Sequence, residues 1–346
     1  MRLANLLGID VPIVLGPFGG LSSVALTAAV SEGGGLGSFG LYGYAPERIR
    51  DTIGALRAAT SRPIAVNLWL PRGDEVTPAD VDVEPFLRAA APLFAAAGVA
   101  PPTPPASFLP AVSDQLDAVF DARPDVLSVV FGIPDADTLA RAGELGIRVL
   151  GTATSVAEAV ALEAAGVDAI VATGAEAGGH RVSFLHDPAH SLVGTFALVP
   201  QVVDAVDVPV IAAGGIADRR GVAAAFALGA AGVQVGTAFL RTRQSAATAG
   251  HRAAISAAAD TDTVLTRAMS GRLARGIPNR AMRELEAAAM IAPFPAQNWL
   301  TGVFRAAAAA AGDHDLVSLW AGQAAGLAQF DDAGDVLREL RAGAPG

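Results

Sequence analysis

Cysteine is absent from the 346-residue chain, and charged residues are scarce at 17%. Without cysteine, disulfide bonds, thiolate metal sites and cysteine nucleophiles are excluded. The formal net charge of −10 argues against a surface for nucleic acid or for an anionic membrane. A small anionic ligand remains compatible with this charge, because such a ligand is bound by local geometry rather than by net charge.

Long hydrophobic runs are also missing, since no stretch approaches the roughly 18 apolar residues of a membrane helix. The apolar stretch within the first 20 residues is broken by Asp10, Pro12 and Pro17. No small-residue cleavage site follows it, so we predict no signal peptide. With 52% hydrophobic residues, the chain has ample material for a large core. We expect a soluble, cytoplasmic protein.

Histidine is rare, and its few positions do not suggest a metal centre. His186 and His190 have the i, i+4 spacing of metal ligands, but Pro188 lies between them and no carboxylate pattern supports a site. We therefore predict no metal site. His251 and His314 are expected at helix ends or on the surface.

Short apolar segments alternate with helical segments along most of the chain. Segments that are apolar on both faces, each but the last followed directly by a helical stretch, indicate a parallel sheet. Eight such units favour a closed TIM (β/α)8 barrel over an open doubly wound sheet. The expected strands are Val11–Leu15, one within Gly33–Gly40, Pro63–Leu68, Val126–Phe131, Arg148–Leu150, Asp168–Val171, Val208–Ala212 and Gly232–Val235.

The barrel is expected to carry a small helical appendage after the eighth strand. We assign residues 1–243 and 293–346 to the barrel with its C-terminal helix, and residues 244–292 to a small helical domain on the substrate side. Within the barrel part, Asp80–Ala97 is predicted to be one amphipathic helix, and Pro101–Pro110 a proline-rich loop.

The loop after the sixth strand combines Glu176, Gly178, Gly179 and His180. A glycine pair lets the backbone approach a ligand closely, and histidine suits proton transfer near neutral pH. Since active sites of such barrels lie at the carboxyl ends of the strands, this loop is a candidate catalytic loop. The alternative is that the glycines only form a turn and that His180 is a solvated loop residue.

Two further loops suggest a phosphate site. Gly214-Gly215 follows the seventh strand and Gly236-Thr237 the eighth, where barrels commonly offer backbone N–H groups to a phosphate. Glycines also end strands for purely steric reasons, which is the other interpretation. The formal G-x-G-x-x-G at Gly35, Gly37 and Gly40 lacks the strand before it and the helix after it that a dinucleotide site needs, so we reject it.

The chain resembles the class I nitronate monooxygenases, formerly called 2-nitropropane dioxygenases, which are FMN-dependent TIM-barrel enzymes. GAEAGGHR (174–181) and PVIAAGGIAD (209–218) are shared with other flavin barrels, including the FMN-dependent enoyl-ACP reductases. The motifs more particular to the family are SGRLARGIPNR, FPAQN and LWAGQAAGL. Two more matching segments are SLVGTFALVPQVVDAV (191–206) and GVQVGTAFL (232–240).

This resemblance implies FMN-dependent oxidation of alkyl nitronates, such as propionate 3-nitronate, by O2 to a carbonyl compound and nitrite. It implies that His180 takes the α-proton from a neutral nitroalkane, or orients a preformed nitronate. A monomer or homodimer acting on a small molecule is expected. The residues expected to bind FMN are Pro17, Phe18, Gly19, Asn67, Thr152, Ala177, Gly178, Gly179, Gly214, Gly215, Gln234, Gly236 and Thr237.

Three positions depart from the family pattern. Phe18 ends a Leu-Gly-Pro-Phe segment where Q-A-P-M is usual, Val130 stands where strand 4 usually has a histidine, and Val182 replaces a glycine. These changes predict a more apolar pocket. They keep two alternatives open, which are another FMN-dependent barrel oxidoreductase, such as an NAD(P)H-dependent enoyl-ACP reductase, and a flavin binder with altered or lost activity.

The basic and aromatic residues after the barrel have two interpretations each. Arg272, Arg275 and Arg280 could attract an anionic substrate or form a solvated basic face. Trp299 and Trp320 are assigned to packing rather than to stacking on the flavin.

Overall fold

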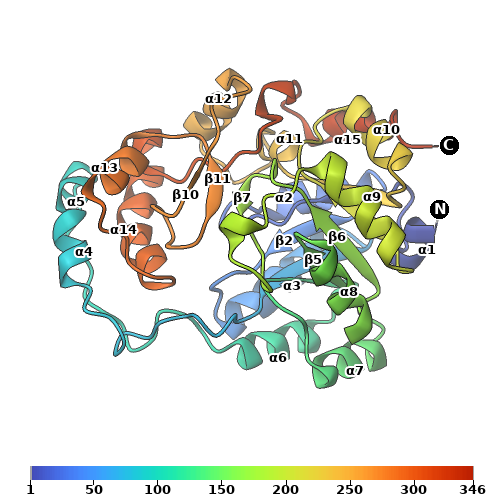
Figure 1. Ribbon diagram of the computed structural model, residues 1–346, viewed down its shortest axis with the longest axis horizontal. Coiled ribbons are helices and arrows are strands. Elements are labelled where there is room, and N and C mark those ends of the chain that lie inside the picture. Colours follow the sequence, from blue (N-terminus) through green and yellow to red (C-terminus); the bar gives the residue numbers. More distant parts are fainter. Residues whose placement is uncertain (1, 346) are drawn as a thin grey trace.

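The computed structural model describes residues 2–345 and contains a parallel barrel with helices around it (Figure 1). The strands of the 8-stranded sheet follow the order β1-β9-β8-β6-β5-β4-β3-β2. A parallel bridge from Val14 to Leu36 joins its two edges, so the sheet is nearly closed and the TIM-barrel prediction is confirmed. The strands are β1 (Ile13–Leu15), β2 (Gly37–Gly40), β3 (Ile64–Trp69), β4 (Val126–Val130), β5 (Arg148–Ala153), β6 (Ala169–Thr173), β8 (Val210–Ala213) and β9 (Gly232–Val235).

The barrel strands alternate their apolar side chains between two cores, as the period of two in a strand requires. Val14, Val171 and Ile211 belong to a core that also takes in Leu3 and Leu7 of α1 (Arg2–Leu7), the helix at the amino-terminal end of the barrel. The neighbouring strand residues pack outward against the helices. Both faces of the sheet are therefore buried, which is why its strands are continuous runs of apolar residues in the sequence.

Side-chain caps begin several of the surrounding helices. Ser23, Asp135 and Ser155 each accept a hydrogen bond from a backbone N–H in the first turn of the helix that follows. The helices around the barrel are α2 (Val24–Glu32), α3 (Pro46–Ala59), α6 (Val112–Ala122), α7 (Ala136–Glu144), α8 (Val156–Ala165), α9 (Thr195–Ala205), α10 (Arg219–Ala227), α11 (Thr237–Leu240) and α15 (Ala333–Arg341).

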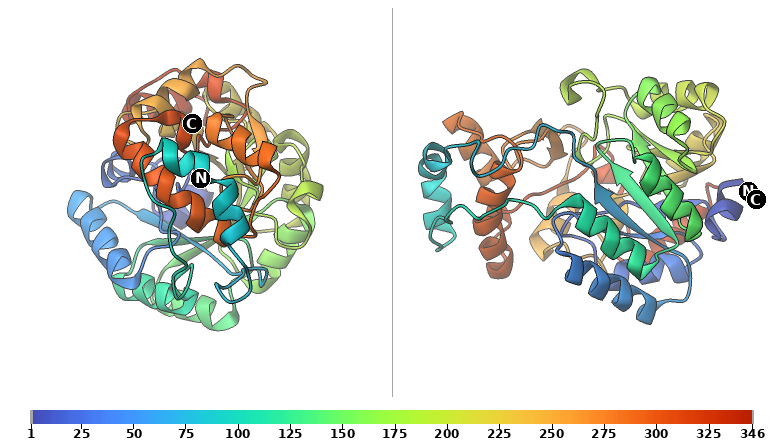
Figure 2. Two further views of the ribbon diagram at one scale, coloured as in Figure 1. Left: turned by 90° about the vertical axis from the view of Figure 1, so that its left-hand side faces the viewer. Right: turned by 90° about the horizontal axis from the view of Figure 1, so that it is seen from below.

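A separate apolar core lies beyond the carboxyl ends of the strands, on the left of Figure 1. It joins α4 (Glu84–Ala89) and α5 (Ala91–Ala96), from the connection after β3, with α13 (Arg280–Ala288) and α14 (Ala296–Ala311). Two segments far apart in the sequence thus build one structure, as both views of Figure 2 show. The domain limits drawn from the sequence stay a prediction.

The single helix predicted over Asp80–Ala97 is wrong, because the chain forms α4 and α5 with a break at Ala90. The second residue of α5 is Pro92, which has no N–H to donate to the preceding turn. A continuous helix would lose that hydrogen bond and meet a steric clash, so the helix ends and restarts.

A small antiparallel sheet, which the sequence did not indicate, ties the barrel to the segment that follows it. Its strands are β7 (Gly179–His180), β11 (Ala274–Gly276) and β10 (Val264–Thr266), with α12 (Ala249–Ala257) before them. His180 is paired with Ala274, and Gly179 with Arg275. The loop after β6 is therefore held by hydrogen bonds to a strand that follows the whole barrel.

Within residues 2–345, no helix has the length and apolar character needed to cross a bilayer. The same residues contain no cluster of three or more histidine, cysteine or acidic side chains with the geometry to hold a metal ion.

Candidate active site

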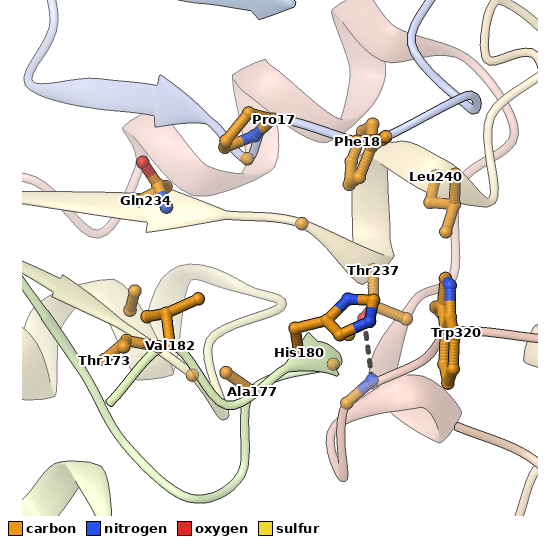
Figure 3. Close-up of a pocket in the computed structure, with 18 of the residues that line it drawn as sticks. Pro17, Phe18, Thr173, Ala177, His180, Val182, Gln234, Thr237, Leu240 and Trp320 are labelled. Carbon is orange, nitrogen blue, oxygen red and sulfur yellow. Dashed lines mark hydrogen bonds between the residues drawn. The ribbon is translucent and has the colours of Figure 1, made fainter. Parts of the chain in front are cut away.

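A cavity of about 230 Å³ lies at the carboxyl ends of the barrel strands, where barrel enzymes carry their chemistry. Figure 3 shows part of its lining. Every site residue predicted from the sequence lines this one cavity, although the roles assigned to them stay predictions. These residues are Pro17, Phe18, Gly19, Asn67, Thr152, Ala177, Gly178, Gly179, His180, Gly214, Gly215, Gln234, Gly236 and Thr237.

Three polar side chains on the barrel strands have hydrogen-bonding capacity left for a ligand. Asn67 on β3 donates from Nδ2 to the carbonyl and hydroxyl oxygens of Ser128, at 3.2 and 3.1 Å, which leaves its Oδ1 free. The side chains of Thr152 on β5 and Gln234 on β9 make no hydrogen bond to any part of residues 2–345. These groups can therefore exchange hydrogen bonds with a ligand in the cavity that has its own donors and acceptors.

The loops after β8 and β9 offer backbone N–H groups to the cavity. Gly214 and Gly215 have φ values of 100° and 73°, a left-handed backbone that favours glycine. The N–H groups of Gly215, Ile216 and Gly236 donate to no acceptor in the described chain. Successive free N–H groups in such a turn form a cradle for an anionic oxygen.

The catalytic loop is held rigid by buried hydrogen bonds. The Glu176 carboxylate accepts from the N–H and the hydroxyl of Thr195, both at 2.9 Å, at the start of α9. Arg181 is only 1% exposed and donates to the carbonyls of Gly174 and Thr173, at 2.6 and 3.1 Å. Burial lowers the pKa of Arg181 to about 10, so the guanidinium stays charged at neutral pH. Both side chains support the loop, and Glu176 also lines the cavity.

The segment before α15 closes over this loop. Gln323 donates its N–H to the carbonyl of Glu176 at 2.9 Å, and Gly322 donates to the hydroxyl of Thr237 at 2.9 Å, the dashed line in Figure 3. The approach is so close that a Cβ on Gly178 would lie 2.6 Å from the carbonyl carbon of Ala321. This contact explains why a glycine is needed there.

His180 is half-buried between aromatic rings. Its ring centroid lies 4.8 Å from that of Trp69 and 5.4 Å from that of Trp320. Burial lowers its pKa to about 3, and the positive charges of Arg272 and Arg305 lower it further in the same direction. The imidazole is therefore neutral at every pH near 7.

The hydroxyl of Ser270 lies 2.8 Å from Nε2 of His180. It also lies 3.1 Å from the carbonyl oxygen of Arg272, to which it can donate. If it donates there, Nε2–H of His180 donates to Ser270 and Nδ1 keeps a lone pair. If it donates to Nε2 instead, Nδ1 carries the proton. Ser270 thus supports either neutral tautomer of His180.

The rest of the wall beside His180 is apolar. The departures noted in the sequence, Val130 and Val182, form a buried cluster with Phe131, against which Trp69 packs. Phe131 has a φ of 71°, which is unusual for a bulky residue and directs its ring toward Trp69, at 4.7 Å between centroids. The lining is therefore more apolar where the family pattern has a histidine, as predicted.

Of the two interpretations of the three arginines, the solvated basic face is wrong for two of them. Arg272, with a side chain 6% exposed, forms ion pairs with Asp74, at 2.6 Å, and with Glu75. Arg275 is buried and donates to the carbonyl of Ala175 at 2.9 Å. Of the three, Arg280 alone is exposed. Local sequence patterns cannot show that Arg272 and Arg275 are buried and paired, because their partners lie in distant segments.

Among the cavity-lining residues that sequence reasoning missed are Tyr42, Trp69, Arg305 and Trp320. Tyr42 follows strand β2, and Trp69 is the last residue of strand β3. Their positions at the carboxyl ends of predicted strands are a signal that could have identified them. Trp320 had been assigned to packing. Arg305 lies within the alanine-rich α14, where nothing in the local pattern distinguishes it from a solvated arginine.

His251 lies at a helix end, in the first turn of α12, but not on the surface, the other position expected from the sequence. It is 1% exposed, and its Nε2 lies 3.0 Å from the carbonyl oxygen of Trp320. Burial lowers its pKa to about 4, and Arg252 acts in the same direction. The segment around Trp320 folds over this face of α12.

The protein is expected to lose stability as the pH falls from 6.5 toward 4. His251 stays neutral in the folded state through this range, whereas an unfolded histidine binds a proton below its ordinary pKa of 6.5. The unfolded state then holds more protons, so its free energy falls relative to the native state, by about 1–3 kcal/mol for one such histidine. Thermal unfolding at several pH values in this range should give a Tm that falls less steeply with decreasing pH for His251→Gln than for the wild type. An equal fall of Tm in the two proteins would contradict this explanation.

An eight-stranded parallel barrel with free N–H groups after β8 and β9, and a neutral histidine at the same mouth, defines a TIM-barrel protein with a polar cavity at the carboxyl ends of its strands. The chain belongs to the nitronate monooxygenase family, whose model, described as "Nitronate monooxygenase", matches residues 1–343. The members of this family are flavin-dependent oxidoreductases.

Relatives and solved structures agree with this assignment. The chain is 42% identical to a "Probable nitronate monooxygenase" of Staphylococcus aureus (strain MRSA252), over 98% of this chain and 96% of the relative. A nitroalkane oxidase from Streptomyces ansochromogenes superposes with a TM-score of 0.90 at 37% identity, covering 99% of this chain and 97% of that one. FabK from Thermotoga maritima superposes with a TM-score of 0.75 at 31% identity, covering 98% and 94%.

Proposed function

We propose that this protein oxidises alkyl nitronates, such as propionate 3-nitronate, with bound FMN and O2, yielding a carbonyl compound and nitrite. The observation that carries the proposal is a neutral, half-buried His180 in the same cavity as the free polar groups of the barrel strands. The nitroalkane oxidase from Streptomyces ansochromogenes, whose fold is so similar, supports a nitro compound as the substrate class.

The lining fits FMN in its chemistry. Asn67, Thr152 and Gln234 provide unpaired donors and acceptors for the edge of a planar ring. The free N–H groups of Gly215 and Gly236 suit a phosphate. When bound, FMN supplies the electron acceptor for the nitronate and passes the electrons to O2.

His180 suits an anionic substrate better than a neutral nitroalkane. With a pKa of about 3 it is a weak base, so taking a proton from a carbon acid would be costly. With Ser270 donating to Nε2, the Nδ1–H is free to donate to a nitronate oxygen. His180 then orients the anion, while the rings of Trp69 and Trp320 exclude water.

The test is to mix the purified yellow protein with propionate 3-nitronate in air and to follow oxygen uptake and nitrite formation. Consumption of O2 with release of nitrite is the expected result. An anaerobic mixture with NADPH is the control, because rapid bleaching of the flavin by NADPH alone would support an enoyl-thioester reductase instead. No response to either reagent would refute both activities.

A further inference from the structure

Arg305 is a cation in the cavity wall that has no anionic partner. Its Nη1 donates to the hydroxyl of Ser318 at 3.1 Å, and its Nη2 donates to the carbonyl and the side-chain oxygen of Asn298, at 3.0 and 2.7 Å. Its Nε is buried without a hydrogen bond in the described chain. These partners are neutral, so the positive charge is solvated only by dipoles.

Two other arginines of this region, unlike Arg305, have acidic side chains near their guanidinium groups. Arg272 is paired with Asp74 and Glu75. Arg181 lies in the field of Glu176. Among the described residues that line the cavity, Arg305 is the one arginine. Burial lowers its pKa to about 10, and no carboxylate opposes this effect, so its charge is costly in the absence of a ligand.

The position of Arg305 separates it from the predicted phosphate cradle. Arg305 lies on α14, in the part of the molecule beyond the strand ends, whereas the glycine loops follow β8 and β9. Asn298, which accepts from Arg305, donates from Nδ2 to the Tyr42 hydroxyl at 3.2 Å. The Tyr42 ring lies 4.1 Å from that of Trp69, the ring that also contacts His180. Arg305 is therefore connected to the His180 side of the cavity.

We propose that Arg305 binds a planar, two-oxygen anionic group of the substrate, either the nitronate group or a carboxylate at the other end of the molecule. Either group supplies the negative charge that Arg305 lacks, and Nη1 keeps one N–H beyond its hydrogen bond to Ser318 with which to donate to it. This proposal rests on the proposed function, because it names the chemistry of the same substrate. It makes Arg305 a specificity-determining residue that favours anionic nitro compounds over neutral ones.

The binding test uses succinate, an unreactive dicarboxylate with the chain length of propionate 3-nitronate, and the flavin-containing protein. Calorimetric titration should show that Arg305→Met raises the Kd for succinate about 10- to 100-fold, as expected for the loss of a charge-assisted pair. Arg305→Lys keeps the charge and should lose less. Arg338→Met, which removes an exposed arginine of α15, is the matched control and should bind succinate as the wild type does.

Thermal unfolding of Arg305→Met should match or exceed the wild type, because the variant removes an unpaired buried charge, and this verifies its fold. An unchanged Kd for succinate in a folded Arg305→Met would overturn the proposal. This result does not depend on turnover, so it remains decisive even if the wild type oxidises no nitronate and the proposed function fails.

Turnover distinguishes the two sources of the anionic group. If Arg305→Met raises the KM for propionate 3-nitronate but not for propyl-1-nitronate, Arg305 binds the carboxylate. If it raises both, Arg305 binds the nitronate group. If both KM values are unchanged, Arg305 does not bind the substrate and the proposal is wrong.

Discussion

Replacing His180 by alanine is expected to lower kcat/KM for propionate 3-nitronate about 100-fold, the usual cost of removing one donor from an anionic reacting group. The lost group is the ring N–H that Ser270 leaves free for the substrate. The gap left between Trp69 and Trp320 would also admit water. His180→Asn keeps an N–H donor at a similar position, so its loss should be closer to tenfold.

The measurement is nitrite release under air as a function of nitronate concentration, with each rate divided by the flavin content of the sample. Because the pKa of His180 is about 3, the wild-type profile of kcat/KM should show no histidine ionisation near pH 6.5. An inflection near pH 6.5 that disappears in His180→Asn would show that the imidazole titrates in the working range and would refute this description of the site.

Replacing Gly178 by alanine is expected to empty the flavin site and to lower the free energy of unfolding by about 1–3 kcal/mol, the usual cost of overpacking. The new Cβ would lie 2.6 Å from backbone atoms of Ala321 and Gly322. Backbone atoms cannot relieve this clash by a side-chain rotation. The covering segment must then move away from Glu176 and Thr237, to which it is hydrogen-bonded. Flavin content by absorbance and urea unfolding measure the two effects.

Gly54→Ala is the matched control, because a Cβ at Gly54 in α3 has open space around it. This variant should keep its flavin and gain a few tenths of a kcal/mol or more from helix propensity. A Gly178→Ala protein with full flavin content and unchanged stability would show that the segment around Ala321 yields freely, and that it does not hold the catalytic loop.

The barrel could be predicted closely because its signals are local. Helix α3 (Pro46–Ala59) begins at a proline and ends at a polar turn, both of which can be recognised in the sequence. Strand β9 matches Gly232–Val235 for a similar reason, because glycines frame a short apolar run. Once the strand ends are known, the barrel geometry gathers their loops at one mouth. The candidate site followed from this step.

The small sheet and the second core could not be predicted, because their signals are not local. Strand β7 has two residues and β11 three, too few for a recognisable alternation of apolar and polar side chains. Their pairing joins His180 to Ala274 across most of the second half of the chain. Arg305 escaped notice for the same reason, since only its burial among distant neighbours distinguishes it.

The pairing of β7 with β11 has a consequence for biosynthesis. His180 and the glycine loops leave the ribosome long before Ala274, Arg305 and Trp320, which complete the cavity around them. A nascent chain that has finished the barrel strands therefore still lacks one wall of its catalytic chamber. A chain truncated before Gly322 would have the catalytic loop but not the segment that covers it.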